Sequence, residues 1–159
     1  MNRIFSYGGL DLGEVQAYMY PHAKELNSVL HRIICDNSVN KDKGALMTKW
    51  DCFKVEEFCT VAEYAQSLID KPTELVDLWG QVYQQGHFQK FHNHIHNDWA
   101  FVYYVNTPTG SSPIVFREIR KRIRPMEGMM IIFPGWVEHY VPPNQCNGRS
   151  IVAGNLVYT

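Results

Sequence analysis

The sequence has no apolar run long enough to span a membrane, and residues 1–15 lack an apolar stretch that ends in a small-residue cleavage site. It also has little net charge, because 15 Lys and Arg residues against 16 Asp and Glu residues leave −1 at pH 7. A near-neutral chain has no general attraction to nucleic acid or anionic lipid, so binding of either would need a local patch. We therefore expect a cytoplasmic protein that binds neither nucleic acid nor membrane.

Several features typical of other protein classes are missing. The four cysteines, at positions 35, 52, 59 and 146, form no C-x-x-C pair and are irregularly spaced, which favours free thiols over a disulfide framework. There is no nucleotide-binding loop, nucleophile elbow or glycosidase-like carboxylate pair. There is also no repeat or long linker, so we expect one domain over residues 1–159, with a helical support region at 1–75 and a β-core at 76–159.

The apolar residues of the first half follow helical spacing. Leu26, Leu30 and Ile34 lie on one face after Pro21, which predicts an amphipathic helix from Pro21 to Cys35. Thr60 and Glu63 have the spacing of a capping box, which predicts a second helix over 61–70 that begins at this point.

From Leu78 onward the apolar residues form short runs rich in Val, Ile, Phe, Tyr and Trp, with turn residues between them. These runs predict strands at 78–83, 88–94, 99–106, 114–118, 128–133, 137–141 and 149–158, with a further one at 47–53. Many short strands after two helices predict an α+β, mainly β fold, such as a sandwich, barrel or jelly roll whose helices pack on one sheet.

A cluster of histidines lies in the segment 86–98. Alternate residues of a strand face the same way, so His92 and His94 would project side by side and could bind one metal ion. His139 supplies a third ligand if residues 128–141 form a strand, a Pro-Gly turn and a second strand. Three ligands leave coordination positions open, as catalysis requires. The alternative is a solvated histidine-rich hairpin, and His22, His31 and His87 have the ordinary explanation of surface or hydrogen-bonded residues.

Four blocks of the second half occur in the order of a known family. They are YQQGHFQKFHNH at 83–94, VYYVNTP at 102–108, GMMIIFPGWVEH at 128–139 and RSIV at 149–152. With these blocks the sequence resembles the 2-oxoglutarate and Fe(II)-dependent oxygenases, specifically a branch of small oxygenases of bacteria and their phages that are similar to prolyl hydroxylases. The resemblance covers residues 80–158 and implies a cupin-like double-stranded β-helix, or jelly roll.

The resemblance also implies a set of functional residues and cofactors. Fe(II) would be held by His92 and His139, and 2-oxoglutarate would bind as cosubstrate, with Arg149 paired to its outer carboxylate. An arginine suits this role because its planar guanidinium can donate two parallel hydrogen bonds to a carboxylate. Tyr104 matches a position that binds the same carboxylate, and Tyr83 one that lines the cosubstrate pocket. The other expected partners are oxygen and a small-molecule or protein substrate.

The chain departs from the family at the third ligand. Most of the family has H-x-D or H-x-E, whereas here His92-Asn-His94 places an imidazole at the carboxylate position. Either the site is formed by three histidines, which we favour, or a carboxylate such as Asp98 replaces His94. The pattern His96-Asn-Asp98 fits less well, because Asp98 directly precedes a predicted strand. A neutral imidazole in place of a carboxylate adds one net positive charge to an iron site.

Two other functions agree with the same pattern. One is a three-histidine dioxygenase of the cupin type that uses no 2-oxoglutarate, and the other is a non-catalytic metal-binding β-sandwich module. The basic run at 117–124 could border the mouth of an active site, although a solvated hairpin explains it more simply. The sequence does not identify the substrate, and it is compatible with a homo-oligomer.

Overall fold

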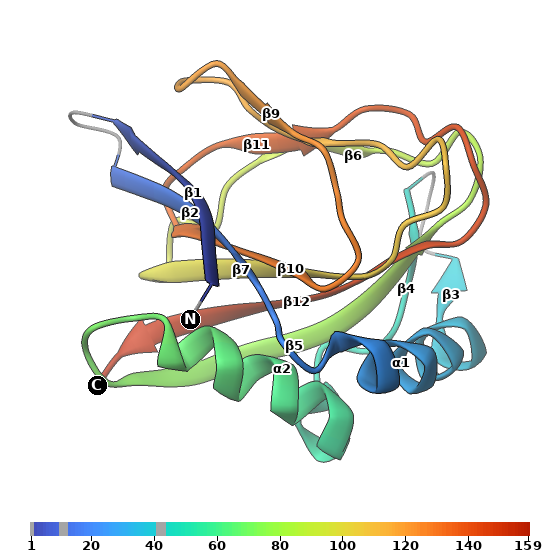
Figure 1. Ribbon diagram of the computed structural model, residues 1–159, viewed down its shortest axis with the longest axis horizontal. Helices are drawn as coiled ribbons and strands as arrows, with labels where there is room; N and C mark the ends of the chain where they lie inside the picture. The colour runs from blue at the N-terminus through green and yellow to red at the C-terminus, as the bar shows by residue number, and fades with distance from the viewer. Residues whose placement is uncertain (1, 10–12, 41–43) are drawn as a thin grey trace.

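The computed structural model describes residues 2–9, 13–40 and 44–159, and it consists of two facing β-sheets and two α-helices (Figure 1). Neither helix of the described residues is long and apolar enough to cross a lipid bilayer. The elements in chain order are β1 (Asn2–Gly9), β2 (Gly13–Met19), α1 (Ala23–Asn37), β3 (Val39–Asn40), β4 (Leu46–Met47), a 3₁₀ turn (Cys52–Lys54), α2 (Glu56–Ser67), β5 (Thr73–Tyr83), β6 (Gln89–His92), β7 (Trp99–Asn106), β8 (Ile114–Phe116), β9 (Lys121–Ile123), β10 (Met129–Pro134), β11 (His139–Val141) and β12 (Arg149–Tyr158).

The larger sheet has eight strands in the order β1-β2-β10-β7-β12-β5-β4-β3, and the smaller has four in the order β6-β11-β8-β9. All strand pairs within the two sheets are antiparallel. Helices α1 and α2 cover the outer face of the larger sheet, and the smaller sheet lies across its other face (Figure 1). This is the predicted mainly β architecture, with the helices packed on one sheet.

Alternation along the central strands divides the core into two layers. Leu78 and Val82 of β5 pack with Ile34 and Phe58 on the helix side. Trp79 and Tyr83, the intervening residues, face the smaller sheet. This second layer also contains Tyr104, which, like Tyr83, is a predicted site residue.

The register between β5 and β12 determines which of their residues lie side by side in the larger sheet. The two strands pair in an antiparallel register that matches Arg149 with Tyr83, Ala153 with Trp79, and Asn155 with Asp77. Alternate residues of each strand therefore form a line of paired side chains on the face toward the smaller sheet.

Several predicted elements match the structure and several do not. The strands at 99–106 and 149–158 have the predicted limits, whereas β1, β2, β3 and β9 were not predicted. A strand over 47–53 is wrong, because β4 ends at Met47 and a 3₁₀ turn follows. The capping box is also wrong: α2 begins at Glu56, and Thr60 lies inside the helix with its hydroxyl donating to the Glu56 carbonyl at 3.2 Å. The four cysteines are free.

Candidate metal centre and adjoining pocket

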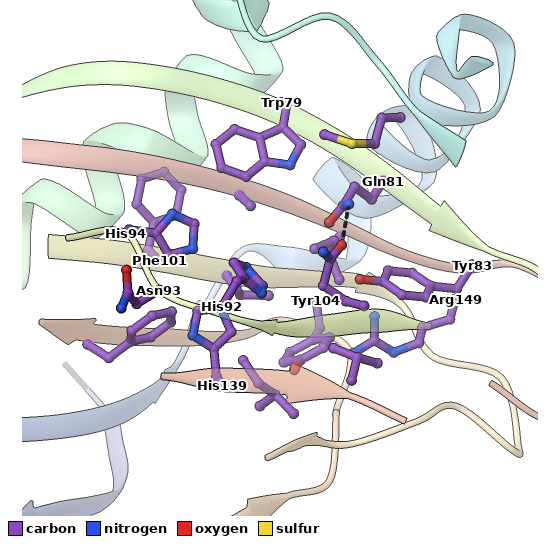
Figure 2. A pocket seen from close by; sticks show the side chains of 18 of the residues that line it. Trp79, Gln81, Tyr83, His92, Asn93, His94, Phe101, Tyr104, His139 and Arg149 are labelled. Atoms are coloured by element: carbon purple, nitrogen blue, oxygen red, sulfur yellow. Dashed lines mark hydrogen bonds between the residues drawn. The ribbon is translucent and has the colours of Figure 1, made fainter. Parts of the chain in front are cut away.

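Strands β6 and β11 are neighbours in the smaller sheet and bring the histidines together. His92 and His139 are direct register partners, with ring centroids 4.3 Å apart. His94 follows the end of β6, and its ring centroid lies 5.1 Å from that of His92 and 5.2 Å from that of His139. One nitrogen from each ring lies within 4.8 Å of the others, a spacing at which one metal ion could bind all three (Figure 2).

The loop that carries His94 is held against the turn that follows β10. The His94 N–H donates to the Gly135 carbonyl at 2.7 Å, and the Gly135 N–H donates to the Asp98 carbonyl at 3.0 Å. A Cβ at position 135 would lie 2.6 Å from the His94 carbonyl oxygen and 2.0 Å from that of Asn97. Only glycine allows this approach, so the Pro-Gly turn of the sequence fixes the position of His94.

Backbone carbonyls orient the other two rings. His92 Nδ1 lies 2.7 Å from the Lys90 carbonyl oxygen, and His139 Nδ1 lies 3.2 Å from that of Val137. A carbonyl only accepts, so in the neutral ring Nδ1 carries the proton and Nε2 keeps a free lone pair. This is the tautomer that binds a metal through Nε2 while an outer partner holds the ring.

The electrostatics of the cluster favour neutral imidazoles. Burial lowers the pKa of His92, and burial together with the charges of His92 and His94 lowers that of His139 well below its usual value. Burial and His92 lower the pKa of His94 to about 4, although Asp77 and a hydrogen bond with Asn155 act in the opposite direction. All three rings are therefore unprotonated near pH 7 and available to a cation.

The cluster borders a cavity of about 260 Å³ that also contains the predicted cosubstrate residues. Arg149, Tyr83 and Tyr104 lie at the end opposite the histidines (Figure 2). The Arg149 guanidinium carbon lies 4.4 Å from the centre of the Tyr83 ring and 5.3 Å from that of Tyr104. Burial raises the pKa of Tyr83, and it raises that of Tyr104 to about 12, so both phenols keep the proton that they can donate.

This end of the cavity contains polar atoms without a partner. Arg149 is 1% exposed; its Nε donates to the Ser112 carbonyl at 2.9 Å, whereas Nη1 has no hydrogen-bond partner within the described chain. The Tyr104 hydroxyl is likewise buried and without a partner there. No acidic side chain is among the described residues that line the cavity. A buried cation is stable only when it is paired, so these donors fit an anionic ligand such as a carboxylate.

Asp98, the alternative ligand, is not part of the histidine cluster. Its carboxylate accepts a hydrogen bond from the Tyr158 N–H at 2.7 Å and so holds the end of β12 instead. The basic run at 117–124 forms the turn after β8 and the paired strand β9, and none of its residues lines the cavity.

Other residues of the site were not predicted from the sequence. Trp79, Gln81 and the half-exposed Trp50 line the cavity, and the buried Trp79 Nε1 has no partner among the described residues. Trp50 and Trp79 have ring centroids 4.3 Å apart. Every second residue from 77 to 83 is polar or aromatic, in the order Asp, Trp, Gln, Tyr, and would lie on one face of a strand. This pattern is the sequence signal that could have indicated Trp79 and Gln81.

No protein-family model matches the sequence. No curated protein matches it either. Solved structures do match: a viral collagen prolyl hydroxylase from Paramecium bursaria Chlorella virus 1, in complex with 2-oxoglutarate, has a TM-score of 0.74 and 13% identity over 91% of this chain and 96% of that chain. The chain has the fold of the 2-oxoglutarate/Fe(II) oxygenases.

Two further structures with the oxygenase fold extend the comparison. A Pseudomonas putida prolyl-4-hydroxylase has a TM-score of 0.66 and 13% identity, over 91% of this chain and 92% of that chain. HygX from Streptomyces hygroscopicus, solved with nickel, 2-oxoglutarate and hygromycin B, has a TM-score of 0.68 and 9% identity, over 91% and 83% of the two chains. These likenesses confirm the predicted double-stranded β-helix fold.

Proposed function

We propose that the protein is a 2-oxoglutarate-dependent dioxygenase that hydroxylates a small molecule or a protein side chain. Fe(II) would be held by His92, His94 and His139, and 2-oxoglutarate would lie between the metal and Arg149. The observation that carries the proposal is the buried Arg149 guanidinium with an unpartnered nitrogen, in the same cavity as three neutral imidazoles. Bound Fe(II) and 2-oxoglutarate supply the oxygen-activating chemistry that such a site uses to oxidise a C–H bond.

The residues of this chain bind and orient the two groups. The Nδ1–H groups of His92 and His139 are held by backbone carbonyls, so their Nε2 atoms would be the ones to hold the metal. Arg149 and the Tyr104 hydroxyl have buried donors without a partner, so Arg149 would neutralise one carboxylate of the cosubstrate and Tyr104 would donate a hydrogen bond to it. Because Arg149 and the histidines lie at opposite ends of the cavity, a ligand that binds at both ends would need an anionic group at each, as a dicarboxylate has.

Apart from Arg149 and the three histidines, the described residues that line the cavity are uncharged, among them Trp50, Trp79, Gln81 and Asn93. A charged group of the substrate would lose its hydration there without gaining an ionic partner. We infer that the reacting part of the substrate is neutral, whether it belongs to a small molecule or to a protein.

A three-histidine dioxygenase without 2-oxoglutarate is the second candidate, since the ligand set matches that class. It gives Arg149 no anionic partner, which is why we place it second.

Anaerobic titration of the Fe(II)-loaded protein with 2-oxoglutarate tests the proposal. We expect a weak visible charge-transfer band that saturates with 2-oxoglutarate and is lost in Arg149→Met. Iron binding without the band would favour the three-histidine dioxygenase, and the absence of iron binding would refute both enzymes in favour of a binding module.

A further inference from the structure

Trp79 is a buried indole beside the histidine cluster. It lines the cavity and is 5% exposed, and its Nε1–H has no hydrogen-bond partner among the described residues. Its ring faces that of His94, with the ring centroids 6.5 Å apart and an interplanar angle of 26°. A buried donor without a partner is costly, so a ligand that brings an acceptor to this position would be favoured.

Gln81 adds an acceptor two residues farther along β5, on the same face of the strand. Trp79 and Gln81 both project from β5 toward the cavity (Figure 2). Gln81 is 7% exposed, and its Nε2 donates to Gln89 Oε1 at 3.5 Å, which leaves the Gln81 carbonyl to accept a hydrogen bond. The two side chains therefore present one donor and one acceptor to a ligand.

Trp50 lines the same cavity and is 44% exposed. Its ring centroid lies 4.3 Å from that of Trp79, with an interplanar angle of 40°. The Trp50 carbonyl accepts a hydrogen bond from the Leu78 N–H at 3.1 Å, and the Thr48 N–H donates to the Gly80 carbonyl at 3.0 Å, so β5 holds this segment in place. A half-exposed indole in a fixed position offers a flat apolar surface on which a ligand can pack.

The size of the cavity limits what can enter it. Its volume of about 260 Å³ lies below the range of about 300–1,000 Å³ for pockets that enclose a whole drug-sized ligand. If 2-oxoglutarate occupies the end at Arg149, the remaining space beside the histidines takes only a small group of the substrate. The rest of the substrate then stays outside, against the exposed part of Trp50.

We propose that the substrate carries a neutral carboxamide, and that Trp79 and Gln81 bind this group beside the metal centre. The Trp79 Nε1–H donates to the carboxamide oxygen, the Gln81 carbonyl accepts from the carboxamide N–H, and Trp50 packs against the apolar part that is attached. An ammonium group would lose its hydration without gaining an ionic partner, and a carboxylate has no N–H for Gln81. This inference rests on the proposed function, since it takes the ligand of these residues to be the substrate of that site.

Two probes of the same shape test the recognition. Benzamide combines a ring with a carboxamide, whereas benzamidinium has the same ring but only donors in place of the carboxamide. Each is titrated by NMR into the protein loaded with 2-oxoglutarate and Zn(II), which replaces Fe(II) because it has no redox chemistry. We expect benzamidinium to bind more than about 10-fold more weakly, because it is charged and leaves the Trp79 N–H unpaired. Equal affinities, or no binding of benzamide, would overturn the inference.

Substitutions assign the effect to the indole N–H. Trp79→Phe removes the donor and keeps an aromatic ring, so the affinity for benzamide should fall by roughly 2- to 12-fold, as for the loss of one neutral hydrogen bond, and that for benzamidinium should not fall. Trp50→Ala removes the packing surface and should weaken both probes. Trp99→Phe is the matched control, because the Trp99 Nε1 donates to the Tyr158 hydroxyl at 2.8 Å and Trp99 does not line the cavity. Equal benzamide affinities of Trp79→Phe and Trp99→Phe would contradict the proposal.

A second measurement remains valid if Trp79→Phe fails to fold. The ¹H–¹⁵N indole signals of the other three tryptophans are assigned with Trp50→Phe, Trp99→Phe and Trp136→Phe, which leaves the signal of Trp79. In the unaltered protein, benzamide should shift this signal downfield and benzamidinium should not, and an unshifted signal at saturation would refute the hydrogen bond. If the protein binds neither Fe(II) nor 2-oxoglutarate, the proposed function fails together with this inference, whereas normal binding of both without an effect of Trp79→Phe refutes the inference alone.

Discussion

The two faces of the larger sheet are formed by the same strands and serve different purposes. On the helix side, apolar residues such as Leu78 and Val82 pack closely against α1 and α2. The fit is so close that a Cβ at Gly80 would lie 2.6 Å from the Ile34 side chain. On the cavity side, the intervening positions carry Trp79, Gln81 and Tyr83. One face is thus closely packed, whereas the other lines a cavity, where we propose that ligands bind.

The cavity face has a cost in stability. The unpartnered donors of Arg149, Tyr104 and Trp79 are buried there, together with three imidazoles of lowered pKa. A buried donor without a partner destabilises a protein by about 1–3 kcal/mol. A ligand that satisfies these donors should therefore stabilise the protein as it binds.

The largest expected effect of a substitution on the cavity face is that of His139→Ala. It removes a buried member of the cluster, so we expect Fe(II) binding and turnover to fall by more than about 100-fold. Loss of a residue that only holds a metal ligand in place weakens metal binding by about 100-fold at most. His96→Ala is the control, because His96 is exposed on the same loop as His94 and lies outside the cluster. Iron content after anaerobic loading measures the effect, and equal iron in the two variants would argue against a metal centre here.

Phe58→Ala tests the helix face. Phe58 is fully buried between α2 and the larger sheet, so its truncation should lower the free energy of unfolding by about 3–5 kcal/mol. Metal affinity of the folded fraction should not change. Urea denaturation measures the loss, with Phe53→Ala at a half-exposed position as the control expected to stay within about 0.5 kcal/mol. A large loss of metal affinity in Phe58→Ala would mean that the two faces are coupled.

Arg149→Met should have opposite effects on binding and on stability. Removing one partner of a buried, hydrogen-bonded charge pair costs about 2–5 kcal/mol, so we expect the affinity for 2-oxoglutarate to fall by roughly 30-fold or more. The free energy of unfolding of the unliganded protein should stay the same or rise, because an uncompensated buried charge is removed. Calorimetry and urea denaturation measure the two effects, and Arg124→Met at an exposed position is the control. Unaltered affinity for 2-oxoglutarate would exclude Arg149 as its anchor.

The histidines should make the metal-free protein less stable in acid. Their folded pKa values lie below the unfolded value of 6.5, and that of His94 is about 4. Between these values the unfolded chain binds more protons, so stability rises with pH from about 4 to 6.5 and is fully present above that range. Urea denaturation at several pH values should show this slope, and His139→Ala should reduce it. A flat profile for the unaltered protein would mean that the rings are solvated.

Local patterns predicted some elements because their physical cause is local. The strands at 99–106 and 149–158 are continuous runs of β-branched, aromatic and small residues between turn residues, and their limits are correct. The predicted start of the second helix is wrong because Glu56 and Glu57, which precede the predicted cap Thr60, already favour a helix N-terminus. Strand β2 was missed since its pairing with β10 joins segments far apart in the chain.

The same distinction applies to the site. The histidines could be predicted because two of them are two residues apart and strand alternation relates them. The pair Trp50 and Trp79 could not, because no local pattern relates residues 29 positions apart, and their rings meet only in the folded chain, with centroids 4.3 Å apart. The sequence also gives no sign that Asp98 is held by the backbone of Tyr158.

Tyr103 and Tyr104 are neighbours in β7, and their side chains lie on opposite faces of the larger sheet. The Tyr103 hydroxyl points to the helix side and donates to Asn27 Oδ1 at 2.7 Å, whereas the Tyr104 hydroxyl is buried at the cavity without a partner in the described chain. Tyr103→Phe leaves a buried acceptor without its donor, so it should lower the free energy of unfolding by about 1–3 kcal/mol and leave 2-oxoglutarate binding unaltered.

Tyr104→Phe should do the reverse. It removes no hydrogen bond from the unliganded protein, so the free energy of unfolding should stay the same or rise slightly. A hydrogen bond to a charged group contributes about 1.5–3 kcal/mol, so the affinity for 2-oxoglutarate should fall by roughly 10- to 150-fold. Calorimetric titration and urea denaturation of the two variants measure both quantities. If both tyrosines affected stability alone, the division between a stabilising face and a binding face would not hold at this strand, because the Tyr104 hydroxyl would have no ligand to meet.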